Sequence, residues 1–203
     1  MHRRIAAGTL ILAVAATQMG CGTHKSAATA ALPTGTTVAG APNPNAPEIV
    51  APGDIPDNQV YVPFTPVSGN YTVKVPEAWA RTDTQGVVTL TDHYNSIRLE
   101  TSQAAAPTVA SVKASEVPGL ASSVNGFRHL AVQSISRPAG QAVLVTYQGG
   151  SAPNPVTGKV ALLDIERYEF WHGGTKLVVT LSGAHGSDNV DPWKTVTNSI
   201  GWR

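Results

Sequence analysis

The sequence predicts an α+β domain in which a mostly antiparallel β-sheet of about six or seven strands is flanked by helices. Three observations predict this class. β-prone segments follow one another across turns that are too short for the crossover a parallel pair needs. Two further stretches place apolar residues at helical spacing. Several strands, such as AVLV and LVVTL, are apolar on both faces, which indicates that both faces of the sheet are covered.

The first expected strand is YTVKV, in which Tyr71, Val73 and Val75 alternate with polar residues. Pro76 ends it, because proline cannot donate to a strand ladder. Two hairpins follow, with the turns HYN and RPAG, and a last pair of strands is joined by HGG. These six strands are GVVTLTD at 86–92, SIRLETS at 96–102, HLAVQSIS at 129–136, QAVLVTYQ at 141–148, KVALLDIERYEFW at 159–171 and TKLVVTLSG at 175–183.

Two helices are expected between and after these strands. Residues 108–124 carry valine and leucine at helical spacing, and Pro118 with Gly119 is expected to break this helix. The second helix lies within residues 187–202, where Pro192 suits the first turn and Asp188 or Asp191 can cap it. Its apolar stripe is expected to face the sheet and consists of Val190, Trp193, Val196, Thr197 and Ile200.

The first twenty residues have the pattern of a secretory signal. Arg3 and Arg4 form a basic end, and an apolar run over 5–16 follows. As a helix this run reaches about 18 Å, well short of the ~30 Å core of a bilayer. Residues 1–20 are therefore interpreted as a signal peptide rather than as a spanning helix.

Cys21 is the only cysteine of the chain and follows this segment directly. A single cysteine in an exported protein suggests intermolecular pairing or special chemistry. The stretch QMGCG resembles the lipobox of bacterial lipoproteins, in which the cysteine is acylated and becomes the mature N-terminus. Gly20 fits that pattern, whereas Gln18 departs from it. The resemblance implies a lipid anchor at Cys21 on the outer side of the cell membrane; cleavage near residues 13–15, or a signal that is never removed, is the alternative.

Residues 21–58 are rich in Ala, Thr, Pro and Gly and contain no aromatic residue. Such a segment cannot bury enough apolar surface to offset its chain entropy, so we expect a disordered tether. Residues 59–203 then form one globular domain. They carry eleven Lys or Arg and ten Asp or Glu, and this balance argues against the clustered basic surface by which proteins bind nucleic acid.

Two stretches resemble a known family. GNYTVKVPEAW at 69–79 resembles the first strand of PsbP/Mog1-like domains, in which a glycine and an aromatic residue lead an alternating strand that is followed by a proline and a tryptophan. Residues 143–203 resemble more narrowly the actinobacterial lipoproteins of the LpqN type. The resemblance implies an α/β/α sandwich built on an antiparallel sheet. It also implies a non-enzymatic accessory or binding role in the cell envelope, without cofactor or catalytic residues.

Motifs for nucleophilic and phosphate chemistry are absent from the sequence. Ser151 in GGSAP and Ser182 in TLSGA do not match G-x-S-x-G, and no G-x-x-x-x-G-K-[ST] occurs. The glycine pairs at 149–150 and 173–174 lie between strands, so turn geometry is expected to require them.

Three histidines lie near predicted turns. His93, His172 and His185 could meet at one edge of the sheet as metal ligands, but no H-x-H or H-x-x-x-H pair is present in the domain. Solvated turn histidines are the favoured interpretation, and no metal site is predicted.

The segment DIERYEF is the most charged strand of the domain. Asp164, Glu166 and Tyr168 are expected on one face, and Ile165, Arg167 and Glu169 on the other. Paired carboxylates can act as acid and base, but beside an arginine they favour an ion-pair cluster between strands. The aromatic residues Tyr168, Phe170 and Trp171 could line a binding surface, although packing in the core is the favoured interpretation.

The polar loop GGSAPNPVTGKV is the longest within the sheet. Its prolines stiffen it, and a preorganised exposed loop suits recognition because it loses less entropy on docking. We therefore expect a contact surface formed by Asn154, Val156 and Lys159, with Tyr168 and Trp171 nearby. A long hairpin tip without a binding role is the alternative.

Together these features predict a non-enzymatic lipoprotein of the cell envelope. Its domain is expected to bind an envelope protein partner, or assist a membrane complex, at the outer face of the plasma membrane. A carrier of a small apolar or lipid-like ligand, held in a pocket between sheet and helix, is the second hypothesis. An envelope hydrolase of unfamiliar type is the third.

Overall fold

The computed structural model describes residues 53–67 and 70–203. The predicted signal peptide, Cys21 and most of the predicted tether lie outside these residues. Within them, no helix is both long enough and apolar enough to cross a bilayer.

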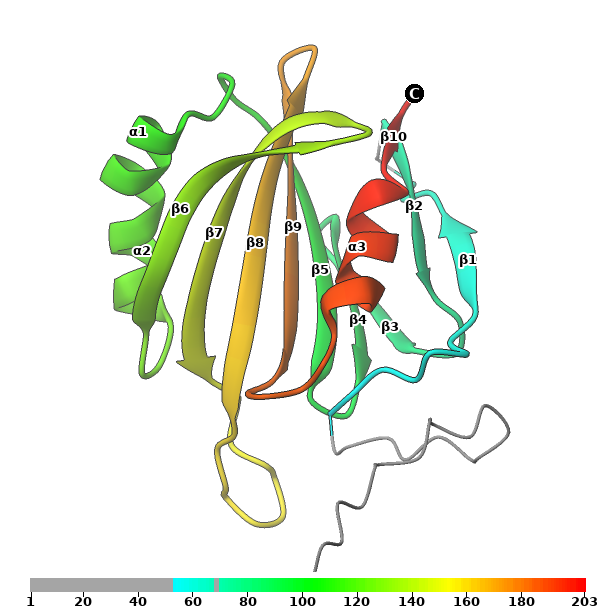
Figure 1. Cartoon of the computed structure of the whole chain (residues 1–203), viewed down its shortest axis with the longest axis vertical. Coiled ribbons are helices and arrows are strands. Elements are labelled where there is room, and N and C mark those ends of the chain that lie inside the picture. Colours follow the sequence, from blue (N-terminus) through cyan, green and yellow to red (C-terminus); the bar gives the residue numbers. More distant parts are fainter. Residues whose placement is uncertain (1–52, 68–69) are drawn as a thin grey trace, which may run out of the picture. The chain divides into compact units, whose positions relative to one another are not determined.

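The central sheet has seven strands, all antiparallel, in the order β3-β4-β5-β9-β8-β7-β6 (Figure 1). Six of the seven expected strands lie in it. Its first strand, β3, was not expected, because its sequence ARTDT is polar and exposed throughout. The strands are β3 Ala80–Thr84, β4 Val87–Asp92, β5 Asn95–Gln103, β6 Arg128–Arg137, β7 Gly140–Gly150, β8 Leu162–His172 and β9 Thr175–Ala184.

The expected strand YTVKV belongs to a second sheet of three strands. It is β2 (Tyr71–Pro76), which lies between β1 (Tyr61–Phe64) and β10 (Gly201–Trp202), and both pairings are antiparallel. Its predicted alternation is confirmed, since Tyr71, Val73 and Val75 are all buried. The sequence predicted the strand and its buried side correctly but not the sheet to which it belongs.

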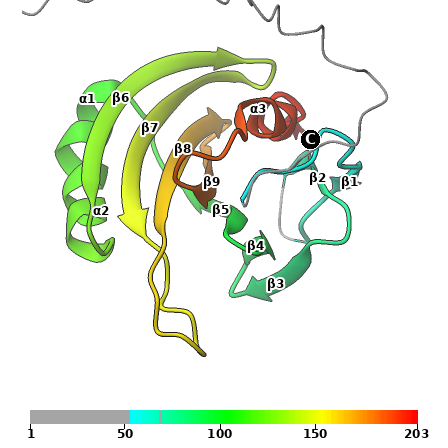
Figure 2. The same cartoon turned by 60° about the horizontal axis from the view of Figure 1, so that its bottom comes forward.

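One face of the central sheet packs against α3 (Val190–Asn198) and the small sheet. Trp193, Val196 and Ile200 of the predicted stripe are buried against strand residues, whereas Val190 is exposed. The sheet curls around α3, as Figure 2 shows. The expected caps are wrong: Asn189 is the N-cap residue and makes no side-chain cap bond.

Asn189 instead ties the start of the described chain to the sheet. Its Oδ1 accepts from the N–H of Ile55 at 2.8 Å, and its Nδ2 donates to Asn95 Oδ1 at 3.0 Å and to the carbonyl of Gly53 at 3.1 Å. Ile55 is buried within the core. Within the described residues, the segment from Gly53 to Asn58, which the sequence placed in the tether, therefore contacts the domain, and its Ile55 packs in the core.

The other face of the sheet is covered over β6, β7 and β8 by one helical segment. It consists of α1 (Val109–Ser111), a π-helical turn η1 (Val112–Glu116) and α2 (Val117–Ser123). The expected break at Pro118–Gly119 does not occur, because Pro118 occupies the first turn of α2, where a missing N–H is tolerated. The helix is irregular one turn earlier, at η1. There the N–H of Val117 donates to the carbonyl of Val112, five residues before it, which is the π-helical pattern. The expected cover on both faces is confirmed.

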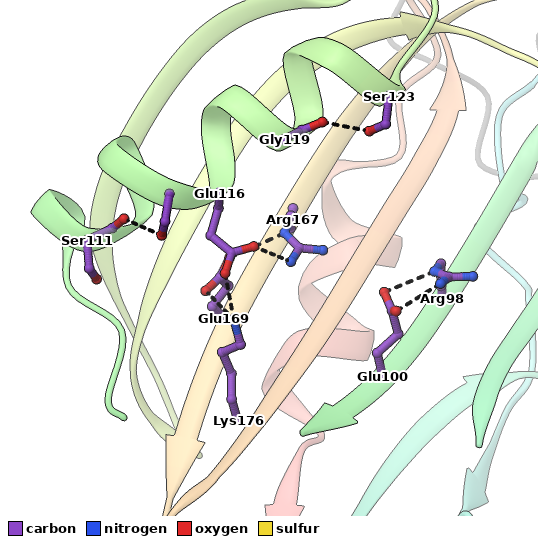
Figure 3. Close-up of polar contacts among 10 residues, drawn as sticks. Arg98, Glu100, Ser111, Glu116, Gly119, Ser123, Arg167, Glu169 and Lys176 are labelled. Carbon is purple, nitrogen blue, oxygen red and sulfur yellow. Dashed lines mark hydrogen bonds and ion pairs between the residues drawn. The ribbon is translucent and has the colours of Figure 1, made fainter. Parts of the chain in front are cut away.

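Four charged side chains fix this helical segment to the sheet (Figure 3). Glu116, from the π-helical turn, pairs with Lys176 at 2.8 Å and with Arg167 at 3.1 Å. Glu169, which is fully buried on β8, pairs with Arg167 at 3.3 Å and with Lys176 at 3.4 Å. The predicted ion-pair cluster on DIERYEF is confirmed, and it reaches across to the helix. We call these four residues the ion quartet.

The pKa values within the ion quartet reflect this pairing. The hydrogen bond from Lys176 does most to lower the pKa of Glu116, against the opposing effect of burial. Burial alone would lower the pKa of Lys176, but the hydrogen bond to Glu116 and the charge of Glu169 outweigh it, and that pKa is raised. Both shifts favour the charged forms at neutral pH.

Removing the Asn189 side chain should destabilise the domain. Asn189→Ala leaves the N–H of Ile55 and Asn95 Oδ1 buried without their partner, which costs about 1–3 kcal/mol. The free energy of unfolding in urea measures this. Asp191→Ala, which removes an exposed i,i+3 ion pair of the same helix, should change it by only about 0.5 kcal/mol. Equal unfolding midpoints for the two variants would contradict the role of Asn189.

Acid should weaken the attachment of the helical segment. The pKa of Glu116 is lower in the folded state than its ordinary value of 4.5, so its contribution is complete above that value and is lost as pH falls through the folded pKa. Glu116→Gln should therefore destabilise the protein by about 1–2 kcal/mol at pH 7, a figure reduced for partial exposure.

The same variant should show a smaller loss of stability than the parent chain between pH 5 and about pH 3. Urea unfolding at both pH values checks this. Glu77→Gln is the matched control, because the Glu77 carboxylate makes no ion pair with any residue in 53–67 or 70–203. An identical acid response in parent and Glu116→Gln would show that the quartet does not act as described.

Candidate binding groove

The loop between β7 and β8, residues 151–161, extends beyond the sheet at its lower end in Figure 1. Asn154 organises its tip. The Asn154 Oδ1 accepts from the N–H groups of Val156 and Thr157, both at 2.9 Å, and its carbonyl accepts from Gly158 at 2.8 Å. The N–H of Asn154 donates to the carbonyl of Lys159 at 2.9 Å. These bonds join the residues of the loop tip to one another, which agrees with the expectation of a preorganised loop.

The base of the loop is closed by Ser151. Its N–H donates to the carbonyl of Ala161 at 2.8 Å, its Oγ accepts from the N–H of Ala161 at 2.9 Å, and the same Oγ donates to the carbonyl of Ala152 at 2.8 Å. Because residues 151–161 bond to one another, β8 begins at Leu162 and not at Lys159 as the sequence predicted. The hydroxyl of Ser151 is engaged in this structural role.

The glycine pair before the loop serves close packing, which corrects the expectation of turn geometry. Gly149 and Gly150 lie inside β7, and neither has a positive φ. A Cβ at Gly149 would clash with Cγ1 of Val124, and one at Gly150 would lie 2.9 Å from Cγ1 of Val160. The N–H of Gly150 donates to the carbonyl of Asn125 at 2.7 Å. The pair therefore lets the end of α2 and the loop approach β7.

The other glycine pair confirms the turn expectation. Gly173 and Gly174 join β8 to β9 with φ values of +55° and +88°, which an L side chain rarely adopts.

A groove of about 440 Å³ lies between the 151–161 loop and the hairpin that joins β4 to β5. We call it the loop groove. Pro153, Asn154 and Pro155 form the loop side, and His93 and Tyr94 form the hairpin side. Its floor is the sheet, where Ser96 and Ser182 hydrogen-bond through their hydroxyls at 2.7 Å. Tyr94 is 45% exposed. Tyr94 was not predicted as a site residue, although an aromatic residue in a polar turn is a usable signal in the sequence.

The structure brings together only part of the predicted contact surface. Asn154 lines the loop groove, and Val156 and Lys159 are exposed on the same loop, Val156 at 90%. Tyr168 is buried in the core, where its hydroxyl donates to Glu166 at 2.7 Å. Trp171 lies near the far end of β8, about 30 Å away at the usual rise per strand residue. Tyr168 and Trp171 therefore do not belong to the surface formed by the loop.

Packing in the core, the favoured interpretation for the aromatic residues of β8, is confirmed for Tyr168 and Phe170 but not for Trp171. Tyr168 and Phe170 stack in the core with their ring centroids 6.1 Å apart, and burial, the largest cause, raises the pKa of Tyr168 to about 12. Trp171 remains partly exposed, and its Nε1 donates to the carbonyl of Ala104 at 2.8 Å.

Asp164 and Glu166, for which the sequence left an acid–base role as the less favoured alternative, each have a structural partner. Glu166 accepts from Tyr168, and Asp164 accepts from His185 Nδ1 at 2.9 Å and from Gln148 Nε2 at 2.8 Å. Burial would raise the pKa of Asp164, but the hydrogen bonds from Gln148, His185 and the N–H of Gly186 outweigh it, and the pKa is lowered. Asp164 thus stays ionised and fixes the turn between β9 and α3.

The three turn histidines do not meet. His93 is in the β4–β5 turn and bonds to Asp92, and His185 bonds to Asp164. His172 ends β8 and stacks on Trp202 at 5.4 Å. In residues 53–67 and 70–203, no group of three or more His, Cys, Asp or Glu side chains could hold a metal ion.

The space between the sheet and the α1–α2 segment is filled by side chains. Val112 packs there against Val143, Val145, Tyr147 and Ile165. A hollow of about 220 Å³ at the start of the helical segment is lined by the apolar residues of 104–107 and Val112 but also by Glu116, Glu169 and Lys176, and these charged groups do not suit an alkyl chain. The hypothesis of an apolar ligand between sheet and helix finds no support in this region.

No protein-family model and no curated protein matches this sequence. Among solved structures, cyanobacterial PsbP (CyanoP) from Synechocystis sp. PCC 6803 is similar with a TM-score of 0.52 and 15% identity, over 74% of this chain and 98% of that chain.

Two further solved structures are less similar, with TM-scores below 0.5. One is a protein of unknown function from Pseudomonas aeruginosa, described as a putative regulator, at 0.44 and 18% identity over 70% of this chain and 97% of that one. The other is LpqN, described as involved in cell envelope biogenesis of Mycobacterium tuberculosis, at 0.41 and 13% identity over 71% and 91%. The similarity to CyanoP confirms the fold implied by residues 69–79, and the domain therefore has the PsbP-like fold.

Proposed function

We propose that this chain is a non-enzymatic, lipid-anchored binding domain that contacts a protein partner through the loop groove at the outer face of the plasma membrane. The observation that carries this proposal is the self-bonded 151–161 loop, which presents exposed apolar side chains beside a groove. The PsbP-like fold agrees with the proposal but does not specify a partner.

A protein partner fits the chemistry of the loop groove. Tyr94 and Pro153 offer apolar contact area in the groove, Val156 is exposed on the adjoining loop, and His93, Asn154 and the Ser96 floor offer polar groups. A mixture of aromatic, aliphatic and polar contacts is typical of protein interfaces. Because the loop is already fixed by Asn154 and Ser151, little conformational entropy is lost when a partner docks.

The absence of an enzymatic role is part of the proposal. Ser151 bonds within its loop, Ser182 bonds to Ser96, and Asp164 and Glu166 are held by His185 and Tyr168. A nucleophile needs an adjacent base that is free to take its proton. Each of these groups instead bonds to a neighbour that fixes a loop, a sheet or a turn.

The location is proposed from the first twenty-one residues. A signal pattern followed by Cys21 predicts export and acylation. Two acyl chains hold a protein stably at a membrane, whereas one holds it weakly. A domain attached in this way would meet partners that are themselves in or on the plasma membrane.

The anchor is tested by Cys21→Ser. The variant should be released from membranes and lose fatty-acid labelling, since the acyl group is its only proposed attachment. Fractionation and metabolic labelling with a fatty-acid analogue measure both. Unchanged membrane retention together with unchanged labelling would reject acylation at Cys21.

The loop groove is tested by Val156→Asp combined with Tyr94→Ala. Loss of apolar contact at hot spots typically weakens an interface by 2 kcal/mol or more, or about thirtyfold. Quantitative proximity labelling in the native cell, followed by cross-linking, should show loss of neighbours that the parent chain labels. Val67→Asp is the matched control, because the Val67 side chain is also almost fully exposed and lies outside the groove. Equal loss in both variants, or no loss in either, would contradict the proposed surface.

A further inference from the structure

A second groove, of about 400 Å³, lies between the β1–β2 pair and the β3–β4 pair. We call it the aromatic groove, after the rings of Phe64 and Trp79 that line it together with the Arg81 side chain. Its apolar floor is formed by Val62, Val75, Pro76 and Leu90. Residues 75–79 of this lining form the end of the motif GNYTVKVPEAW. The loop groove does not include them, so it gives this part of the motif no role in binding.

Both rings of the aromatic groove are held in place. Trp79 packs edge-on against the buried Trp193 of α3, with ring centroids 6.5 Å apart at 88°. The guanidinium of Arg81 lies 5.3 Å from the centroid of Phe64, a cation–π contact. A partner that packs on these rings therefore meets a surface that is already ordered.

The backbone that carries Trp79 is strained. Ala78 has a φ of +68°, a region that alanine rarely adopts. Strain of this kind costs energy and is often found where a side chain must be presented for binding. Here the strained residue directly precedes the tryptophan of the groove.

Trp79 also offers an unused hydrogen-bond donor. The indole N–H groups of Trp171 and Trp202 donate to the carbonyls of Ala104 and Ala139. Trp79 is only partly buried, and within residues 53–67 and 70–203 its Nε1 has no acceptor. The rim is charged as well: in the same residues Glu77 and Arg81 are exposed, and neither forms an ion pair.

We propose that the aromatic groove binds a proline-rich, extended segment of a protein partner. A polyproline II segment presents proline rings for packing on aromatic faces and leaves its backbone carbonyls free of internal hydrogen bonds. Phe64 and Trp79 supply the faces, and Trp79 Nε1 supplies a donor for one carbonyl. An alkyl chain would pack on the rings but would leave the indole N–H unused.

The charges on the rim specify the segment further. Arg81 lies on the rim and pairs with no carboxylate among residues 53–67 and 70–203, so an acidic residue beside the prolines can form an ion pair with it. This inference rests on the proposed function to the extent that the partner is a protein, but it concerns a different surface from the loop groove.

The test uses the full chain carrying Cys21→Ser, labelled with ¹⁵N, and the peptide PPPDPPP as probe. Titration should shift the indole Nε1–H resonance of Trp79 and leave those of Trp171 and Trp202, which are already bonded, almost unchanged. The peptide AAADAAA, which keeps the charge and lacks the prolines, should produce no shift of Trp79. Laurate is the probe for the alternative occupant.

Two variants make the inference specific. Trp79→Phe keeps a ring but removes the donor and should weaken peptide binding about five- to tenfold, as expected for one hydrogen bond. Arg81→Ala should weaken PPPDPPP more than PPPNPPP. Trp171→Phe, the same chemical change at an indole outside the groove, is the matched control and should leave the affinity unchanged.

The inference is overturned if PPPDPPP leaves Trp79 Nε1–H unshifted at millimolar concentration. It is also overturned if AAADAAA or laurate shifts Trp79 as strongly, or if Trp79→Phe and Trp171→Phe behave alike. Should Trp79→Phe fail to fold, the titration of the parent indole resonances decides alone. Because the readout is peptide binding in solution, it stays independent of Tyr94, Val156 and the loop groove.

Discussion

The structure depends on one constraint, which is that the central sheet buries side chains on both of its faces. On β8, Phe170 packs toward α3 while its neighbour Glu169 lies buried beneath the helical segment. A sheet of this kind requires a layer on each side. The layer of α3 supplies large apolar residues such as Trp193. The other layer supplies one fully buried valine, Val112, and partly buried residues such as Val117 and Leu120, and the ion quartet completes its attachment.

The two surfaces proposed for binding lie at the ends and margins of the sheet, away from the faces covered by α3 and by the helical segment. The loop groove lies where the β7–β8 loop passes the β4–β5 hairpin, and the aromatic groove lies between the small sheet and the edge strands β3 and β4. Each is built on rigid support: hydrogen bonds centred on Asn154 in one case and the contact of Trp79 with Trp193 in the other. Binding surfaces on ordered loops beside a rigid scaffold are common in proteins.

The sequence predicted the strands whose alternation or apolar content is strong and missed those without either. β3 reads ARTDT and gives no signal, and the assignment of β2 to a separate sheet depends on its pairing with residues at both ends of the domain. Asn154 and Val156 could be placed on an exposed loop because proline and asparagine mark such a loop in the sequence, and their contact with a partner stays a proposal. Tyr168 and Trp171 were misplaced because they are near in sequence to the loop, whereas a strand carries its residues away at about 3.3 Å each.

The proposal that this domain binds through an ordered loop is tested most directly by amide hydrogen exchange in the free chain. The N–H groups of Val156, Thr157 and Gly158 each have an acceptor on Asn154, so they should exchange at least about tenfold more slowly than in an unstructured peptide. Asn154→Ala should remove the protection of Val156 and Thr157, whose acceptor is the side chain. Exchange of all three at the rate of an unstructured chain in the parent protein would contradict the account, because the loop would then not be organised before a partner arrives.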